Sequence, residues 1–583
     1  MQTFKKLLFL LSVRERKQTI LLLIILIITA ILEAIGVASI LPFVIVLTNP
    51  VVIETNFILN AIFKFSSILG VENNEQFIFA LGILVLVIFF ISLIIKILTI
   101  IASNRFVQMR EYTIGKRLVE GYLRQPYNWF LSRHSADLGK TILSQVNQVI
   151  VNGIRPLLEL ISKSLVVILL FILLFITEPI LTVIIGLTFV TLYLFIFFLL
   201  RKYLTRIGLE RLKNDQLRFL AVNEAFGAIK EIKIGGFEEN YLKNFSKSSQ
   251  IFSKNYAISI TLSQFPRYIL ELLCFGGILL ILLNILSRSG SLNSALPILS
   301  LYVYAGYRLI PAIQQIYASF SQLTFIGPAL DKLYDELKAL QSPNKNQDQS
   351  PLIFNKTIIF NKTIILKNIH YHYPNSSNTS LKNINLTIPS KSIVWVVGPT
   401  GSGKTTLVDI ILGLLEPQIG TLEVDKKVII NQNVRSWQRL IGYVPQHIYL
   451  SDDTISANIA FGEDPKDINH DIVEKCSKIA SLHNFVIDEL PNKYQTKIGE
   501  RGVRLSGGQR QRIGIARALY RSPRLLILDE ATNALDNITE QIILDAIKNL
   551  SKDITVIIVT HRLNTVKNYD TIIKLEKGLI AEK

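Results

Sequence analysis

The chain has 583 residues, of which 50% are hydrophobic and 18% charged, and its mean hydropathy is +0.40. This balance excludes an ordinary soluble protein, and the length allows more than one domain. The formal net charge of +18 is typical of proteins that bind nucleic acid or contact a membrane surface. The positions of the basic residues along the chain must distinguish between these two possibilities. With only two cysteines, Cys274 and Cys476, no disulfide framework is expected.

Six apolar stretches are long enough to cross a bilayer as helices, which takes about 20 residues. They lie at about residues 20–48, 77–103, 157–177, 179–200, 268–286 and 296–320. Basic residues precede the first stretch and no small-residue cleavage site follows it, so we interpret it as a retained span rather than a signal peptide. Residues 1–340 are therefore expected to form an all-α membrane domain with six spans.

The basic residues are concentrated in particular loops. The long connections after the second and fourth stretches are rich in Lys and Arg, whereas the connection after the first holds Lys64 against three glutamates. Because basic loops stay on the cytoplasmic side, both termini and both long loops are predicted to be cytoplasmic. The positive charge is therefore explained by the orientation of the chain in the membrane, and no nucleic-acid partner is expected.

The composition changes at residues 341–353 to Ser, Pro, Asn, Lys, Gln and Asp, which is typical of a linker. A short direct repeat follows, because residues 354–359 and 360–365 both read FNKTII. From residue 354 to 583 short β-rich runs alternate with helical patterns, which predicts an α/β domain.

A phosphate-binding loop lies early in this second domain, between the predicted strand Ile393–Val397 and a helical pattern. Its glycines let backbone N–H groups close around phosphates, and the helix N-terminus adds a positive dipole. Lys404 is expected to reach the β- and γ-phosphates of ATP, and the Thr405 hydroxyl to bind Mg²⁺. The predicted nucleotide-binding residues are Gly398, Pro399, Thr400, Gly401, Ser402, Gly403, Lys404, Thr405 and Thr406.

Two acids follow a second hydrophobic strand, Leu525–Leu528. Asp529, at the carboxyl end of that strand, suits the coordination shell of Mg²⁺. Glu530 suits a general base that orients the attacking water. Together with the phosphate-binding loop, this pair predicts an ATP hydrolase.

Further motifs resemble those of ABC ATPases and occur in that family's order. Leu505-Ser506-Gly507-Gly508-Gln509 matches the family signature. The remaining matches are Tyr373 in Tyr-His-Tyr-Pro, Gln446 in Tyr-Val-Pro-Gln, Ala534-Leu535-Asp536 and His561 in Val-Thr-His-Arg. The resemblance implies that Tyr373 stacks on adenine, that Gln446 contacts Mg²⁺ and water, and that His561 contacts the γ-phosphate.

The resemblance assigns Ser506 and Gly508 to the γ-phosphate of the ATP held by the opposite subunit, and Gly507 and Gln509 complete the nucleotide-binding signature. One chain carries one phosphate-binding loop and one signature, so the resemblance implies a second copy and hence a homodimer. Six spans before the ATPase resemble a half-size ABC exporter of the type IV fold. By the same resemblance, the segments near Gln125–Arg133 and Leu220–Ile229 are the coupling helices.

The substrate is less well specified by the sequence. Three segments resemble bacterial lipid-linked oligosaccharide flippases of the inner membrane: residues 224–238, Tyr307–Pro311 and the sequence around the signature. A peptide or drug exporter, or an exporter of another lipid, stays open as the alternative. Residues Asn56–Leu69 form an amphipathic pattern that fits either an interfacial helix or a loop helix packed on the spans.

Charged residues also occur in or near the spans, where they usually face a cavity or a partner. They are Glu33, Lys96, Lys163, Arg267, Glu271 and Arg308. Arg267 and Arg308 are the candidate ligands of an anionic head group, because guanidinium binds phosphate bidentately. Snorkelling of Lys96 and Arg267, and a pair between Glu271 and a neighbour, are the alternatives.

Overall fold

The computed structural model describes residues 2–48, 50–68, 71, 73–177, 179–272, 275–276, 279, 296–341, 360–374, 378–499, 502–532, 535–561 and 571–582. The chain divides into two compact units. The first comprises Met1–Gln125 and Ser132–Ser342, and the second comprises Pro126–Leu131 and Pro343–Lys583. The predicted linker lies almost entirely outside the described residues.

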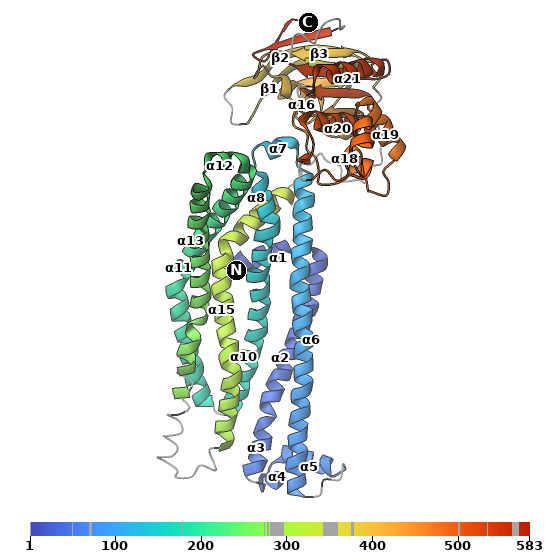
Figure 1. The fold of residues 1–583 in the computed structure, drawn as a ribbon. Helices are drawn as coiled ribbons and strands as arrows, with labels where there is room; N and C mark the ends of the chain where they lie inside the picture. Colours follow the sequence, from blue (N-terminus) through green and yellow to red (C-terminus); the bar gives the residue numbers. More distant parts are fainter. Residues whose placement is uncertain are drawn as a thin grey trace. The chain divides into compact units, whose positions relative to one another are not determined.

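The first unit is helical throughout its described part (Figure 1). Its helices, including the π-helical turns η1 and η2, are α1 (Gln2–Leu10), α2 (Val13–Ala38), α3 (Ile40–Thr48), α4 (Val52–Thr55), α5 (Phe57–Ser67), α6 (Asn74–Leu123), α8 (Ser135–Lys140), η1 (Thr141–Gln145), α9 (Val146–Val149), η2 (Ile150–Ile154), α10 (Arg155–Thr177), α11 (Pro179–Gly227), α12 (Ile229–Gly235), α13 (Glu238–Gln264) and α15 (Leu296–Gln341).

Four helical stretches among the described residues are long and apolar enough to cross a membrane: Val13–Thr48, Asn74–Leu123, Ser135–Thr177 and Thr182–Gly227. They contain the first three predicted spans and most of the fourth. The fifth predicted span lies largely outside the described residues, and the sixth belongs to α15, which is not among the four. The organisation into six spans therefore stays a prediction.

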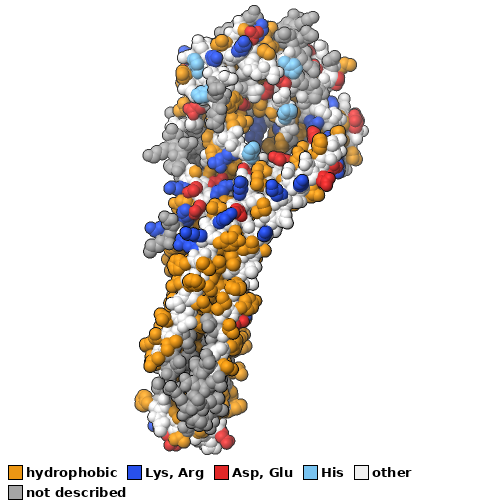
Figure 2. Space-filling view, turned by 90° about the vertical axis from the view of Figure 1, so that its left-hand side faces the viewer, with side chains coloured by type: hydrophobic (Ala, Val, Ile, Leu, Met, Phe, Trp, Pro, Cys, Tyr) orange, Lys and Arg blue, Asp and Glu red, His pale blue; other side chains and the backbone are white. Residues whose placement is uncertain are grey.

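The helices α6 and α11 continue far beyond the length that a bilayer requires. With 50 residues, α6 extends about 75 Å at 1.5 Å per residue, against a hydrocarbon core of about 30 Å. α11 packs against α13 and α15. Gly208 lets α11 approach α15 closely, because a Cβ at this position would meet the carbonyl oxygen of Phe325. Figure 2 shows hydrophobic side chains on the face of the helical unit that includes α11, and many apolar side chains of α6 are exposed as well, as suits contact with lipid.

Most buried charges in the first unit occur as ion pairs, which reduces the cost of removing them from water, whereas the buried guanidinium of Arg211 lies against aromatic rings. The carboxylate of Glu15, which belongs to the capping box at the start of α2, lies 2.7 Å from Arg110 Nη1. The other pairs are Glu33 with Lys96 at 2.6 Å, Asp215 with Lys140 at 3.5 Å and Asp215 with Arg218 at 2.7 Å. Lys96 is thus paired rather than snorkelling.

The amphipathic segment predicted at Asn56–Leu69 forms α5, which is apolar on two sides. Leu59 is buried and Phe63 packs with it against the start of α6, including Phe77, whose ring centroid lies 5.0 Å from that of Phe63. Phe57 and Phe65 are exposed, the former by 88%. The helix therefore packs on the span and also presents an apolar outer edge, so it combines features of both alternatives.

The second unit contains two sheets and the helices around them (Figure 1). Its strands are β1 (Thr363–His372), β2 (Thr379–Pro389), β3 (Ile393–Val397), β4 (Ile419–Val424), β5 (Lys427–Val428), β6 (Ile441–Val444), β7 (Leu525–Asp529), β8 (Thr555–Thr560), β9 (Thr571–Glu576) and β10 (Leu579–Glu582). Its helices are α7 (Tyr127–Leu131), α16 (Lys404–Ile411), α17 (Val434–Gln438), α18 (Ile455–Ile459), α19 (His470–Ile479), η3 (Phe485–Glu489), η4 (Lys493–Gln495), α20 (Gly507–Tyr520) and α21 (Asn537–Leu550).

The larger sheet has the strand order β10-β9-β3-β8-β7-β6, in which β6, β7, β8, β3 and β9 run parallel. β3, β7 and β8 are buried along their whole length, as expected for parallel strands covered on both faces. The smaller, antiparallel sheet has the order β2-β1-β4-β5. The carboxyl ends of the parallel strands therefore meet at one edge, where ligands bind in open α/β sheets.

The second copy of the FNKTII repeat leads into β1. Phe360 is buried, and its ring packs edge-on against Trp437 at 5.9 Å between centroids. The carboxylate of Asp425, in the turn between β4 and β5, accepts hydrogen bonds of 2.8–2.9 Å from the backbone N–H groups of Asn361, Lys362 and Thr363. Residues 354–359, the first copy, lie outside the described part of the chain.

Candidate nucleotide site

The phosphate-binding loop leaves the centre of the large sheet, since β3 pairs with β8 on one side and β9 on the other. Gly401 and Gly403 have φ values of +78° and +104°, which side chains disfavour. A Cβ on Gly403 would also lie 2.8 Å from the carbonyl oxygen of Ser380. At the start of α16, Lys404 Nζ donates hydrogen bonds to the carbonyl oxygens of Gly398 (2.8 Å) and Pro399 (3.0 Å).

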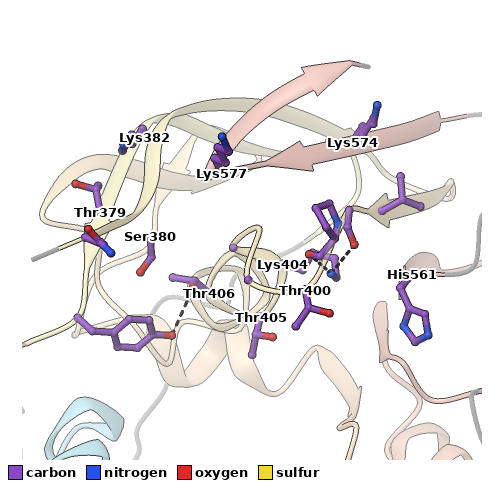
Figure 3. A pocket seen from close by; sticks show the side chains of 18 of the residues that line it. Thr379, Ser380, Lys382, Thr400, Lys404, Thr405, Thr406, His561, Lys574 and Lys577 are labelled. Atoms are coloured by element: carbon purple, nitrogen blue, oxygen red, sulfur yellow. Dashed lines mark hydrogen bonds between the residues drawn. The ribbon is translucent and has the colours of Figure 1, made fainter. Parts of the chain in front are cut away.

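A pocket of about 1310 Å³ surrounds this loop (Figure 3). Eight of the nine predicted loop residues line it, and Ser402 does not. The predicted residues Tyr373, Gln446, Glu530 and His561 line it as well. Tyr373 is held beside the loop by a 3.2 Å hydrogen bond between its hydroxyl and that of Thr406. The structure thus brings separate sequence motifs to one pocket.

Glu530, Gln446 and His561 converge within this pocket. Gln446 Nε2 donates a 2.8 Å hydrogen bond to Glu530 Oε2, and His561 Nδ1 lies 3.5 Å from Glu530 Oε1. Glu530 follows β7, Gln446 follows β6 and His561 follows β8, three neighbouring strands of the sheet. The backbone of Glu530 has a φ of +51°, a strained conformation for this residue that is typical of functional sites.

Two buried carboxylates lie close to the loop. Asp529, at the end of β7, is 6% exposed and accepts a 3.4 Å hydrogen bond from the Tyr443 hydroxyl. Burial and the charge of Glu530 raise the pKa of Asp529. Burial raises the pKa of Asp409 in α16 to about 6, and the charge of Asp529 adds to this rise. A cation bound here would therefore relieve the repulsion among these acids.

The signature residues Ser506, Gly507, Gly508 and Gln509 do not line this pocket. They form the N-terminus of α20, where Ser506 and Gln509 make a capping box. The Ser506 hydroxyl accepts a 3.2 Å hydrogen bond from the Gln509 N–H, and Gln509 Oε1 accepts one of 2.8 Å from the Ser506 N–H. In the predicted motif Ala534-Leu535-Asp536, Ala534 lies outside the described residues and Asp536 is the N-cap residue of α21.

Three lysines that the sequence motifs did not indicate also line the pocket. Lys382 on β2, Lys574 on β9 and Lys577 in the β9–β10 turn line it (Figure 3). The turn is joined to the loop by a 3.0 Å hydrogen bond from the Gly578 N–H to the Ser402 carbonyl. The sequence signal for this turn was the pair Lys577-Gly578 between the last two strands, since glycine suits the φ of +79° found at Gly578.

The two predicted substrate ligands lie in the first unit. Arg267 Nε donates a 2.7 Å hydrogen bond to Glu271, one helical turn further on. Arg308 in α15 donates a 3.2 Å hydrogen bond to the Tyr304 hydroxyl, and its guanidinium lies near the Tyr307 ring. Its buried Nε has no hydrogen-bond partner among the described residues. No described contact joins the two arginines.

Comparison with protein families identifies both units. Residues 18–304 match the family described as ABC transporter transmembrane region, and residues 381–533 match the family described as ABC transporter. The chain is an ABC exporter. This confirms the predicted fold class, a helical membrane domain of the exporter type with an α/β ABC ATPase domain. The exporter binds and hydrolyses ATP and is a multi-pass membrane protein.

Its relatives cover different parts of the chain. An ATP-dependent lipid A-core flippase of Cupriavidus pinatubonensis is 29% identical over 495 residues, which are 83% of this chain and 80% of the flippase. The flippase of the same name from Saccharophagus degradans is 38% identical over 45% of this chain and 44% of its own length. Human ATP-binding cassette sub-family B member 5 is 43% identical over 37% of this chain, which spans only 17% of that protein.

A solved structure of a bacterial Atm1-family ABC exporter with ATP bound has a TM-score of 0.76 to this exporter. It covers 97% of this chain and 94% of its own, at 21% identity. At that identity the likeness establishes the exporter fold alone.

Proposed function

We propose that this exporter is an ATP-driven lipid flippase of the bacterial inner membrane, and that its substrate is a lipid-linked oligosaccharide. The convergence of Gln446 and His561 on Glu530 carries the ATPase part of the proposal. The transport of a lipid is supported by the relatives named lipid A-core flippase. The oligosaccharide rests on the local sequence resemblance around residues 224–238 and Tyr307–Pro311.

In the hydrolysis step, Glu530 accepts the proton of the attacking water as a general base. Gln446 fixes the orientation of the Glu530 carboxylate, and His561 contacts the γ-phosphate from the end of β8. Lys404 exchanges its loop carbonyl partners for phosphate oxygens when ATP binds, since charge-assisted hydrogen bonds to phosphate are stronger. Tyr373 stacks on the adenine.

Mg²⁺ fits the oxygen donors that surround this loop. Mg²⁺ is commonly held by one or two protein oxygens together with substrate phosphates and waters. Thr405, Gln446 and Asp529 would hold it, and the ion would supply neutralisation of the developing phosphate charge. Burial and the charge of Glu530 raise the pKa of Asp529, and a cation beside this carboxylate would favour its charged form. Among the described residues, no group of three or more His, Cys, Asp and Glu side chains is arranged so that it could hold a metal ion by itself.

The working unit is proposed to be a homodimer. The signature residues Ser506–Gln509 lie outside the pocket that holds the loop of their own chain, so they are free to bind the nucleotide of a second copy. The N-terminus of α20 offers a positive dipole and N–H groups to a γ-phosphate. Both chain termini are proposed to be cytoplasmic, on the basis of the basic loops.

The proposed domain boundaries are those predicted from the sequence. Residues 1–340 form the membrane domain with six spans, residues 341–353 the linker and residues 354–583 the ATPase domain. Arg308 is the stronger candidate for a pyrophosphate ligand, because its Nε is buried and lacks a described partner. The charge of Arg267 is already matched by Glu271.

The decisive experiment is reconstitution in proteoliposomes with a fluorescent polyprenyl-pyrophosphate-linked glycan, whose accessibility to a membrane-impermeant quencher is followed after addition of ATP and Mg²⁺. ATP-dependent movement of the glycan lipid, absent in Glu530→Gln, supports the proposal. If lipid A or a phospholipid moved instead, that lipid would be assigned as the substrate in place of the lipid-linked oligosaccharide. ATPase stimulation by peptides with no lipid movement would refute lipid flipping.

A further inference from the structure

The membrane unit contains a second cavity, far in sequence from the nucleotide loop. It has a volume of about 400 Å³ and is lined by residues of α2, α6, α10 and α15. Its walls are mixed. Leu26, Ile100, Leu158 and Val166 make it apolar on part of its surface, while charged and hydroxyl side chains make up the rest. This volume falls in the range of about 300–1,000 Å³ that is typical of small-molecule sites.

The polar side chains of the cavity are linked across helices. Lys96 Nζ of α6 lies 2.6 Å from Glu33 Oε1 of α2, and the Glu33 side chain is only 7% exposed. On the same two helices, the hydroxyls of Thr29 and Thr99 are 2.7 Å apart. These contacts hold α2 against α6 on one side of the cavity.

A second group of polar contacts in the cavity is organised around Glu159 of α10. Gln315 Nε2 of α15 donates a 2.6 Å hydrogen bond to Glu159 Oε2, and Arg155 Nε lies 3.2 Å from Glu159 Oε1. Both carboxylates of the cavity, Glu33 and Glu159, therefore already have a cationic partner.

The charges of the lining do not balance. It contains three cations, Lys96, Arg155 and Lys163, and two carboxylates. Within the part of the chain that the structure describes, Lys163 makes no hydrogen bond and has no ion-pair partner within 4 Å. An ammonium group in a membrane domain is costly unless it meets an opposite charge or water. The cavity thus has one cation in excess.

We infer that this cavity binds an anionic phosphate group, with Lys163 as its first ligand and Glu33 as an internal competitor for Lys96. A phosphate that contacts both Lys163 and Lys96 would compete with the Glu33 carboxylate for the Lys96 ammonium group, because two anions beside one ammonium group repel each other. Glu33 then lowers the affinity of the site and allows release. The apolar wall suits the hydrocarbon part of a lipid, and this assignment of the source rests on the proposed lipid transport.

The test is calorimetric titration of the full-length protein in a neutral detergent, with ADP saturating the nucleotide site. The probes are short-chain phosphatidic acid, short-chain phosphatidylcholine and inorganic phosphate. Phosphatidic acid should bind, and phosphatidylcholine, which shares the chains but carries no net charge, should bind at least about tenfold more weakly. Saturable binding of inorganic phosphate with the same dependence on Lys163 would identify a free anion, rather than a lipid head group, as the ligand.

Three variants separate the roles of the side chains. Lys163→Gln should weaken phosphatidic acid binding about tenfold, Lys163→Arg should retain it, and Glu33→Gln should strengthen it by a similar factor. Lys116→Gln is the matched control, since it removes an exposed lysine of the same unit that does not line the cavity. Unchanged binding in Lys163→Gln, or weaker binding in Glu33→Gln, would overturn the assignment. Binding is measured without hydrolysis, so this assignment can fail while ATP-driven flipping persists, and it can hold where flipping fails.

Discussion

The carboxylate of Glu530 accepts a 2.8 Å hydrogen bond from the side-chain amide of Gln446. This bond joins the residue after β7 to the segment after β6, and the His561 ring approaches the same carboxylate from the end of β8. The position of the proposed base therefore depends on three segments at once. A displacement of the Gln446 segment would move the carboxylate directly.

We predict that Glu530→Gln retains ATP binding and loses turnover by about 10²–10⁴-fold, because an amide can hold the water but cannot accept its proton. Steady-state phosphate release and nucleotide binding, measured on the same preparation, test this. Glu463→Gln is the control, since this exposed carboxylate pairs with Arg521 outside the pocket. Near-normal hydrolysis by Glu530→Gln would remove Glu530 as the base.

Lys404→Ala is expected to weaken ATP binding itself, by about tenfold or more, since it deletes a phosphate counter-charge. Titration with a fluorescent ATP analogue measures the effect. Lys577→Ala offers a matched comparison, because this lysine lines the same pocket from the β9–β10 turn. We expect a smaller loss for it, and equal losses would mean that the turn contributes as much charge to the nucleotide as the loop does.

Ser506→Arg should spare ATP binding but block cooperative hydrolysis, because a long cation at the start of α20 obstructs a second subunit's nucleotide. The variant also removes a helix cap, which costs about 1 kcal/mol. Ser506→Ala removes the same cap without the bulk and is the control. The shared site is tested by measuring the Hill coefficient of ATP hydrolysis and, by light scattering, the oligomeric state of each variant. A fully active monomer, or cooperative hydrolysis by Ser506→Arg, would contradict the shared site.

The carboxyl of Asp409 should make stability depend on pH. Its pKa of about 6 lies above the unfolded value of 3.8, so the folded state binds more protons between these values and stability falls as pH rises through this window. Asp409→Asn removes the penalty and should stabilise the ATPase unit by about 1–3 kcal/mol at neutral pH. Thermal unfolding of both proteins at pH 5 and pH 7.5 tests this, and a variant that gains nothing at the higher pH would disprove it.

Replacement of both Arg267 and Arg308 by Ala should abolish flipping of a lipid-linked pyrophosphate and leave basal ATPase activity largely intact, since neither lines the nucleotide pocket. The single variants rank the two sites. We expect Arg308→Ala to account for most of the loss, because Arg267 is paired with Glu271. Full flipping by the double variant would exclude both residues as ligands.

The nucleotide loop could be predicted from the sequence because its parts are contiguous. A buried strand, a run with glycines at Gly401 and Gly403, and a helix starting at Lys404 form one local unit whose geometry is set by its own residues. The convergence of Gln446, Glu530 and His561 is different. Each could be recognised only by its own motif, and their proximity follows from the order of β6, β7 and β8 in the sheet, which no local pattern states.

The membrane unit shows where sequence reasoning was insufficient. Lys96 and Glu33 are 63 positions apart in the sequence, and their pairing depends on the rotation of two helices about their axes. Leu59 and Phe63 interrupt the polar side of the predicted amphipathic helix, yet they are the residues that pack against α6. A helical wheel separates polar from apolar positions, but it does not determine which of two apolar sides meets the protein.

The Asp425 carboxylate has a mechanical consequence for the chain. It holds three successive N–H groups at the start of β1, and β1 lies between β2 and β4 with hydrogen bonds on both sides. Tension that arrives along the backbone from residue 359 is therefore borne by the Asp425 bonds first and then shared by two ladders loaded in shear. The first FNKTII copy precedes this anchor in the sequence, so the duplication lengthens the chain ahead of the Asp425 contacts by six residues and leaves the first anchored residues of the ATPase domain unchanged.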